Sequence, residues 1–202
     1  MIYNYNRIFC VGRNYFSHIK EMNNEIPKKP IIFLKQKNSI SLSNKIYYPD
    51  NTKEFSYESE LVLKMGDIKD KLINSVESFT LGLDLTLRDI QRDSIERGLP
   101  WEKSKAFDCS APLGNFYNIK TSKDLNGLTF TLKINNVIKQ IGKVENMIFS
   151  FEEILSEISI YWKLEKGDLI FTGTPEGIGT LKKGDILDLF SNKTKKITWQ
   201  VI

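Results

Sequence analysis

The stretch YESELVLKMG, residues 57–66, decides how the rest of the chain is interpreted. Its pattern predicts a β-strand, in which successive side chains point to opposite faces. Glu58 and Glu60 therefore share one face, whereas Leu61 and Leu63 share the other. Two carboxylates side by side among apolar residues indicate either an edge strand that faces solvent or a pair of oxygen ligands for a cation.

Similar apolar runs with β-branched and aromatic residues recur along the chain and predict a strand-dominated fold. They lie at 7–12, 30–36, 45–49, 78–85, 128–134, 137–142, 168–173 and 185–190. Only Asn135 and Asn136 separate two of these runs. Because asparagine tolerates positive φ, the pair predicts a tight β-hairpin.

A few helices are predicted by their end signals. Residues 86–98 begin with Thr86 and Asp89 in the spacing of a capping box, and residues 150–162 open with SFEE, a second capping box. A third, shorter helix is predicted within residues 14–22. The polar loop that follows it, NNEIPKKP, contains two prolines and is the predicted hinge of a mobile lid.

Length and composition predict one domain over residues 1–202. Hydrophobic residues make up 41% and charged residues 27%, which is typical of soluble globular proteins and excludes a disordered chain. The apolar runs are too short to span a bilayer and the N-terminus lacks a signal-peptide pattern, so we expect a cytoplasmic protein with no membrane partner. Cys10 and Cys109, without a C-x-x-C motif, favour reduced thiols over a disulfide or zinc framework.

The formal net charge is +4, which raises the question of a polyanionic partner. The lysines near the C-terminus form only a modest patch, and no aromatic residues alternate with them in a stacking pattern. We therefore expect no nucleic-acid partner. A mildly cationic pocket for small acids is equally compatible with this charge.

A third carboxylate can complete the pair in the opening stretch. Asp84 lies at the end of a predicted strand, directly before a predicted helix. A carboxylate in such a place is commonly a local cap, but together with Glu58 and Glu60 it would make three oxygen ligands. An all-oxygen site suits Mg²⁺, Mn²⁺ or Ca²⁺, whereas zinc would normally recruit imidazole or thiolate. Such an ion keeps open positions for substrate oxygens and acts as a Lewis acid.

His18 is the only histidine, so any imidazole acid–base chemistry must come from it. Glu21 follows three residues later, and on a helix it would share a face with the ring and orient it. The alternative is an ordinary surface or packing histidine. In the Gly- and Pro-punctuated segment GLPWEKSKAFDCSAPLG, a buried lysine could hold negative charge that develops on an oxygen. Spacing alone does not choose between Lys103 and Lys105.

The segment FTGTPEGIG, residues 171–179, combines three glycines with two threonines. It lacks the GK[ST] of a phosphate-binding loop and a following helix, so nucleotide binding is not predicted. Its backbone amides and hydroxyls could still bind a carboxylate.

Taken together, these segments resemble the fumarylacetoacetate hydrolase family, most of all its acylpyruvate hydrolase and oxaloacetate decarboxylase branch. The resemblance runs roughly from Ile8 to Phe190 and is carried, in order, by FCVGRNYFSHIKEM, IIFLKQ, YESELVLKMG, GLDLTLRDIQRDSIERGLPWEKSKAFDCSAPLG and GDLIFTGTPEGIG. It implies an α+β, β-rich fold, a roll of mixed β-sheets with a few short helices, commonly assembled as a homodimer. FLKQ in place of the frequent FLKP and the short lysine-rich loop after Glu21 depart from the family pattern and bear on substrate choice.

The resemblance assigns nine residues to a site. The implied ligands of Mg²⁺ (or Mn²⁺) are Glu58, Glu60 and Asp84. The implied catalytic residues are His18 and Glu21, a dyad on a lid helix that activates water, and Lys105, which lies beside the metal. The implied substrate contacts are Arg13, Gln91 and Thr174.

The activity that this resemblance implies is metal-dependent hydrolysis of a C–C bond in acylpyruvate-type 1,3-diketo acids, or decarboxylation of oxaloacetate, through a pyruvate enolate. One alternative is an isomerase or tautomerase of 2-oxo acids, similar to 2-hydroxyhepta-2,4-diene-1,7-dioate isomerase. Another is a non-enzymatic module that binds metal or small acids. The presence of His18, Glu21 and Lys105 argues against a mere binder, because a binder needs no base.

Overall fold

The computed structural model describes residues 5–202 and consists mainly of short strands with a few helices. The strands are β1 (Ile8–Gly12), β2 (Ile31–Lys35), β3 (Ile40–Ser41), β4 (Lys45–Ile46), β5 (Phe55–Tyr57), β6 (Ser59–Met65), β7 (Val76–Leu83), β8 (Thr86–Leu87), β9 (Ala111–Pro112), β10 (Tyr117–Asn118), β11 (Thr129–Ile134), β12 (Val137–Lys143), β13 (Leu169–Phe171), β14 (Gly179–Thr180), β15 (Ile186–Ser191) and β16 (Thr194–Val201). The α-helices are α1 (Phe16–Glu21), α2 (Arg88–Glu96), α3 (Glu102–Lys105) and α4 (Phe151–Tyr161).

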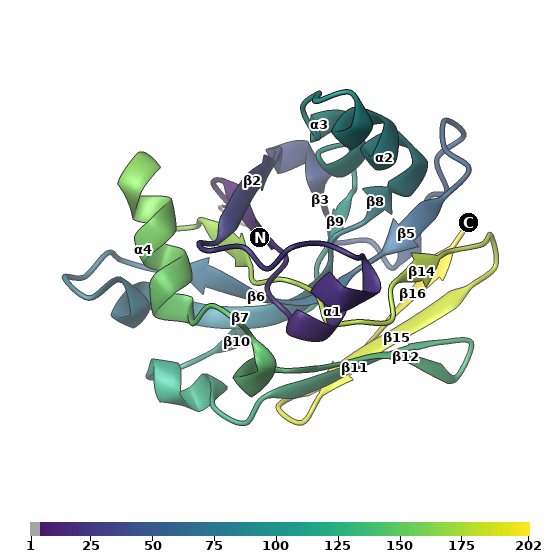
Figure 1. Cartoon of the computed structure of the whole chain (residues 1–202). Coiled ribbons are helices and arrows are strands. Elements are labelled where there is room, and N and C mark those ends of the chain that lie inside the picture. Colours follow the sequence, from purple (N-terminus) through teal and green to yellow (C-terminus); the bar gives the residue numbers. More distant parts are fainter. Residues whose placement is uncertain (1–4) are drawn as a thin grey trace.

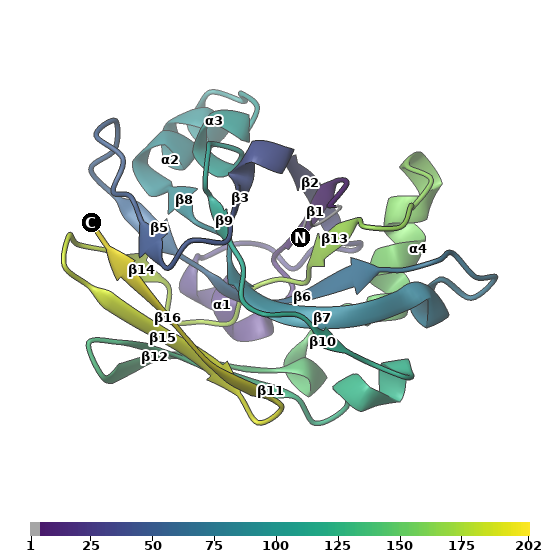
Figure 2. The same cartoon turned by 180° about the vertical axis from the view of Figure 1, so that it is seen from behind.

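Two sheets hold most of the strands (Figures 1 and 2). The larger has the order β10-β7-β6-β13-β1-β2, and the second has the order β12-β11-β15-β16-β4. β1 runs parallel to β13, and β4 runs parallel to β16, whereas the other neighbours in both sheets are antiparallel. Two smaller sheets, β14-β5-β8 and β3-β9, join them. The predicted β-rich α+β fold with mixed sheets is confirmed.

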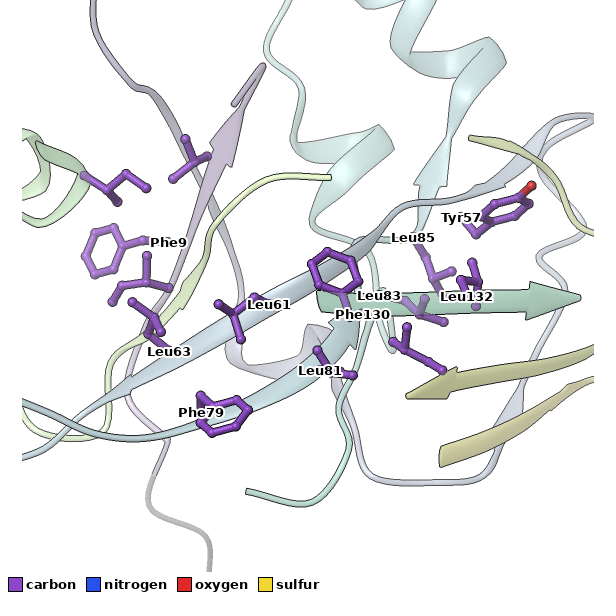
Figure 3. Close-up of a cluster of buried hydrophobic side chains, with 14 of the residues drawn as sticks. Phe9, Tyr57, Leu61, Leu63, Phe79, Leu81, Leu83, Leu85, Phe130 and Leu132 are labelled. Carbon is purple, nitrogen blue, oxygen red and sulfur yellow. The ribbon is translucent and has the colours of Figure 1, made fainter. Parts of the chain in front are cut away.

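The apolar core lies between the two large sheets. Leu61 and Leu63 from β6 and Leu81 from β7 pack in one cluster with Phe130 and Leu132 from β11 (Figure 3). The opposite face of β6 is also buried, against a second cluster. β6 is therefore an interior strand between β7 and β13, and the alternative of a solvent-facing edge strand is wrong.

Two local predictions are confirmed. Asn135 and Asn136 have φ of 51° and 66° and connect β11 to β12 as a tight hairpin, because asparagine enters the left-handed region at low cost. Ser150 caps α4: its side chain accepts a hydrogen bond from the Glu153 backbone N–H, and the Glu153 carboxylate accepts one from the Ser150 backbone.

The predicted start of the helix at Thr86 is wrong. Thr86 belongs to β8, which pairs with β5, and α2 begins two residues later at Arg88. The Asp89 carboxylate accepts hydrogen bonds from Thr52 Oγ1 and the Lys53 backbone N–H rather than completing a capping box with Thr86. Sheet pairing has therefore displaced the cap that the local pattern favours. No helix among residues 5–202 has the length and hydropathy needed to cross a membrane.

Candidate metal centre and active site

Three carboxylates meet where β6 begins and β7 ends. Glu58 occupies the break between β5 and β6, Glu60 follows in β6, and Asp84 comes directly after β7. The antiparallel register pairs Ser59 with Leu83, and the Asp84 backbone N–H donates to the Glu58 carbonyl at 2.8 Å. Each carboxylate offers an oxygen within 4.8 Å of the other two, and all three side chains are buried. Pairing of β6 with β7 therefore brings together three carboxylates that lie in two separate segments of the sequence.

Two buried lysines contact this trio. Lys105 Nζ donates to Glu58 Oε2 at 2.8 Å, to Asp84 Oδ2 at 2.7 Å and to Thr86 Oγ1 at 2.7 Å. The structure therefore distinguishes Lys105 from Lys103, which is exposed on the same helix. Lys35 Nζ lies 2.8 Å from Asp84 Oδ1, so Asp84 is held between two ammonium groups.

The two glutamates of β6 have opposite electrostatics. Burial opposes ionisation of Glu58, but Lys105 and Arg88 outweigh it and hold the pKa of this carboxyl below its ordinary value of 4.5. Burial also opposes ionisation of Glu60, and there the repulsion from Asp84 and Glu58 adds to it, so the pKa of Glu60 lies well above 4.5. Neighbours two residues apart therefore differ in which protonation state the fold favours.

Glu60 is the feature that fits a divalent cation. It is 2% exposed, and within residues 5–202 it has no ion pair; Gly173 N–H donates to its Oε2 at 2.7 Å. A buried carboxylate without a compensating charge is costly, and a cation shared with Glu58 and Asp84 would compensate it. The donor set is oxygen only, which suits Mg²⁺ or Mn²⁺ better than zinc.

The histidine dyad lies on α1. His18 Nδ1 is 3.3 Å from Glu21 Oε2, and the ring is largely buried. Glu21 also accepts a hydrogen bond from the Gly177 backbone N–H at 3.1 Å, so it connects α1 to the loop after β13. Because Nδ1 faces the carboxylate, Nε2 is the nitrogen left to accept a proton.

One pocket gathers the predicted residues. Its lining includes eight of the nine: Arg13, His18, Glu58, Glu60, Asp84, Gln91, Lys105 and Thr174. Glu21 is the ninth and reaches the pocket only through His18. Arg13 has a φ of 60°, an uncommon conformation for a residue with a side chain and one that is frequent at functional sites. Phe33 and Trp101 provide an apolar wall.

Gln91 and Thr174 already have protein partners. Gln91 Oε1 accepts from Arg88 Nη1 at 2.6 Å. Thr174 Oγ1 donates to the Ser59 carbonyl at 3.0 Å and accepts from Gln140 Nε2 at 2.9 Å. Their contact with substrate stays a prediction, and Thr174 first of all fastens its loop to β6.

Sequence reasoning missed two basic residues of the centre. Arg88, the first residue of α2, hydrogen-bonds through Nη2 to Glu58 Oε1, and it lines the pocket. Lys35, the last residue of β2, is 3% exposed and also donates to Ser110 Oγ at 2.9 Å. The available signal was a lysine that continues an apolar strand, IIFLK, where a solvated side chain is not expected.

Comparison with known proteins gives consistent matches over nearly the whole chain. Residues 7–201 match the family model described as fumarylacetoacetate (FAA) hydrolase C-terminal. The oxaloacetate tautomerase FAHD1, mitochondrial, of Bos taurus is 36% identical over 184 residues, which cover 88% of this chain and 83% of that protein. The oxaloacetate decarboxylase, mitochondrial, of Dictyostelium discoideum is 38% identical over 189 residues, which cover 90% and 86%.

A solved structure agrees in fold as well as sequence. Fumarylpyruvate hydrolase from Pseudomonas aeruginosa, in complex with Mn²⁺ and pyruvate, superposes with a TM-score of 0.88 at 31% identity, covering 98% of this chain and 90% of that one. The resemblance that the ordered motifs indicated is therefore confirmed.

Proposed function

This chain belongs to the fumarylacetoacetate hydrolase family, and on that premise we propose that it is a divalent-metal-dependent enzyme that converts oxaloacetate through an enolate, by tautomerisation or decarboxylation. The observation that carries the proposal is the joint placement of an uncompensated Glu60 and the buried ammonium of Lys105 in the pocket that His18 lines. The names of the bovine and Dictyostelium relatives support oxaloacetate as the substrate.

We assign Glu58, Glu60 and Asp84 as the ligands of the ion. When bound, the ion supplies Lewis-acid polarisation of the substrate's 2-oxo oxygen. Lys105, 2.8 Å from Glu58, adds a fixed positive charge beside the same place and stabilises negative charge that develops on that oxygen.

His18 moves the proton in tautomerisation. The proton on carbon 3 of oxaloacetate passes to Nε2, and its bonding electrons move into the enolate. Return of a proton to the enolate oxygen gives the enol. The Glu21 carboxylate orients the ring through Nδ1 and supports the imidazolium that forms. In decarboxylation the C3–C4 bond breaks instead, CO₂ departs and the electron pair enters the enolate, so no base is required for that step.

A second candidate is hydrolysis of an acylpyruvate, favoured by the His18–Glu21 dyad and by the fumarylpyruvate hydrolase neighbour. Here His18 takes a proton from water, the resulting hydroxide attacks the distal carbonyl, and the C–C bond breaks. The products are a carboxylic acid and pyruvate enolate, which takes up a proton to give pyruvate. Decarboxylation of oxaloacetate forms the same pyruvate enolate, and Lys105 would stabilise it in both reactions.

Product analysis separates these reactions. Oxaloacetate, acetylpyruvate and fumarylpyruvate are each incubated with the metal-stripped protein plus Mg²⁺, Mn²⁺ or EDTA, and enol absorbance, CO₂ and pyruvate are followed. We expect metal-dependent turnover of oxaloacetate. Lys105→Met is expected to lower kcat about 10²–10³-fold, the usual loss when one charge-stabilising donor is removed. The matched control, Lys103→Met on the same helix, is expected to retain wild-type kcat. Turnover that EDTA leaves unchanged would contradict the proposal.

A further inference from the structure

β12 lies at the outer edge of the five-stranded sheet and carries none of the nine predicted site residues. Most of its side chains are exposed, but Gln140 is 1% exposed. A β-bulge explains the difference. Leu132 pairs with Gln140 and Lys133 pairs with Ile138, so Lys139 is the extra residue. The bulge turns Gln140 onto the buried face of the sheet.

The Gln140 amide joins two segments of the site. Its Oε1 accepts from both the Ser59 backbone N–H and Ser59 Oγ at 2.9 Å. Its Nε2 donates to Thr174 Oγ1 at 2.9 Å and to the Pro175 carbonyl at 2.8 Å. The orientation of the amide follows from its partners, because the Ser59 N–H can only donate and the Pro175 carbonyl can only accept.

Ser59 stands between the two glutamates of the metal centre. Because strand side chains alternate, Ser59 faces away from the ligand side, and Gln140 therefore holds this stretch from behind. On the loop side, Gly173 N–H donates to Glu60 at 2.7 Å, and Thr174 Oγ1 donates to the Ser59 carbonyl at 3.0 Å. Residues 58–60 and 173–175 thus form one hydrogen-bonded unit with a single amide bridging its back.

The bulge also supports the histidine side of the pocket. Gly177 has a φ of 91°, and a Cβ placed there would lie 2.0 Å from the Lys139 carbonyl oxygen. The strand therefore packs directly against the backbone at position 177. The N–H of that residue is the group that donates to Glu21. β12 consequently adjoins both the carboxylate trio and the loop that orients the dyad.

We propose that Gln140 is a positioning residue that sets the spacing between the metal ligands and the loop at residues 173–177. The proposal rests on the proposed function, since it concerns the same centre. An amide is required because it presents an acceptor to Ser59 and donors to Thr174 and Pro175 at once. Methionine would leave these buried groups without partners, and glutamate would set an oxygen against the Pro175 carbonyl.

Mn²⁺ titration of the full-length, metal-stripped protein tests this by calorimetry, below the unfolding transition of each variant. We expect Gln140→Met and Gln140→Glu to bind Mn²⁺ about 10–100-fold more weakly than wild type, the usual loss when a residue behind a metal ligand is replaced. The control Gln200→Met makes the same chemical change at an exposed position and is expected to leave the affinity unchanged. At saturating Mn²⁺, kcat for oxaloacetate is expected to fall in both Gln140 variants, whereas a change that affected only folding stability would leave kcat and affinity intact.

Gln140→Glu keeps the test decisive if Gln140→Met folds poorly, and a double-mutant cycle tests the contact with Ser59 separately. Ser59→Ala removes the hydroxyl that donates to Gln140 and keeps the backbone N–H, so it is expected to weaken Mn²⁺ binding modestly alone and to add nothing in the Gln140→Met background, whose side chain offers that hydroxyl no amide oxygen. Wild-type affinity and kcat in the Gln140 variants, or additive effects in the cycle, would overturn the positioning role. Failure of the wild-type protein itself to bind Mn²⁺ would instead overturn the proposed function, and the role of Gln140 with it.

Discussion

The carboxylate trio and the histidine dyad share a pocket but are attached to the molecule in different ways. Glu60 lies on β6, where six of seven residues are buried and apolar clusters pack on both faces. His18 lies on the six-residue helix α1, in which only His18 and Ile19 are buried. Polar bonds hold this helix: Asn14 Nδ2 donates to the Thr172 carbonyl at 2.8 Å, and Glu21 accepts from Gly177. The carboxylate trio, here called the metal side, is therefore part of the buried core. The dyad on α1, here called the base side, is attached mainly by polar contacts, and we expect changes there to leave the protein folded.

The largest effect is expected when the base of the dyad is removed. His18→Ala is expected to lower the kcat of acylpyruvate hydrolysis about 10²–10⁴-fold, because water activation needs a general base. Oxaloacetate decarboxylation, which needs none, should be largely spared, and Mn²⁺ affinity should match wild type. Both activities are measured by pyruvate release, with Lys20→Ala on the exposed face of α1 as the control. Equal loss of both activities would contradict this division of labour.

On the metal side, Glu60→Gln is expected to weaken Mn²⁺ binding by more than about 100-fold, since residues behind a ligand already account for 10–100-fold. It should also raise the unfolding free energy of the metal-free protein, because the neutral amide replaces a carboxyl group that folding must either protonate or bury as a charge without a partner. Glu58→Gln should instead lower the unfolding free energy of the metal-free protein. It leaves Arg88 without its carboxylate partner and Lys105 with Asp84 alone, and it is expected to cost about 3–5 kcal/mol of unfolding free energy. Urea denaturation in EDTA measures both, and a destabilised Glu60→Gln variant would show that the two glutamates are equivalent.

The attachment of α1 can be weakened without changing the carboxylate trio or the histidine dyad. Asn14 is fully buried, and its Oδ1 also accepts from the Phe149 N–H at 2.8 Å. Asn14→Ala is expected to cost about 1–3 kcal/mol of unfolding free energy, because it leaves buried backbone groups unpaired. It should reduce kcat while leaving Mn²⁺ affinity unchanged, and the exposed Asn51→Ala provides the matched control. Reduced metal affinity in Asn14→Ala would mean that the two sides are coupled.

The smallest effect is a pH dependence that distinguishes the two glutamates. The raised pKa of Glu60 means that the folded, metal-free protein holds a proton that the unfolded chain releases, so stability falls as pH rises from about 4.5 through the raised value. The lowered pKa of Glu58 has the opposite sign and contributes stability that is lost only as pH falls below about 4.5. Mn²⁺ must displace the Glu60 proton, so its affinity should rise up to about tenfold per pH unit in that upper window. Thermal melts in EDTA measure the stability trends, and calorimetry measures the Mn²⁺ affinity. Glu60→Gln should abolish the loss of stability above about pH 4.5 and the rise of Mn²⁺ affinity with pH.

The parts of the fold that the sequence predicts are those that depend on local patterns of apolar residues, turn residues and helix caps. Apolar runs with β-branched and aromatic residues predicted strands such as β1, β6 and β7, and the Asn135–Asn136 hairpin and the Ser150 cap depend on neighbouring residues only. Thr86 has an equally good local signal, yet it lies in β8, because pairing with β5 is a long-range interaction that a local pattern does not contain. The four-residue helix α3 is too short to produce a periodicity.

The site residues also divide into those that the sequence identifies and those that only the folded structure identifies. The carboxylates were recognisable because charges inside an apolar strand demand a reason, and the single histidine limited the choice of base. Lys35 carries that same signal, but only its contact with Asp84, which the tertiary fold creates, identifies it as part of the centre. Gln140 gives no signal at all, since only the bulge at Lys139 turns it inward. Roles that arise from a register shift become visible only once the strands are paired.

The basic residues around the trio have a consequence for the order in which ligands arrive. Three cations face three carboxylates, namely Lys35, Arg88 and Lys105 against Glu58, Glu60 and Asp84. With all three carboxylates ionised these formal charges cancel, so a bound divalent ion would make the pocket floor doubly positive and a dianionic acid would restore neutrality. We expect ion and acid to associate sequentially, the ion first. The association rate of the acid should then slow with increasing ionic strength, as it does wherever a charged cavity steers an oppositely charged ligand.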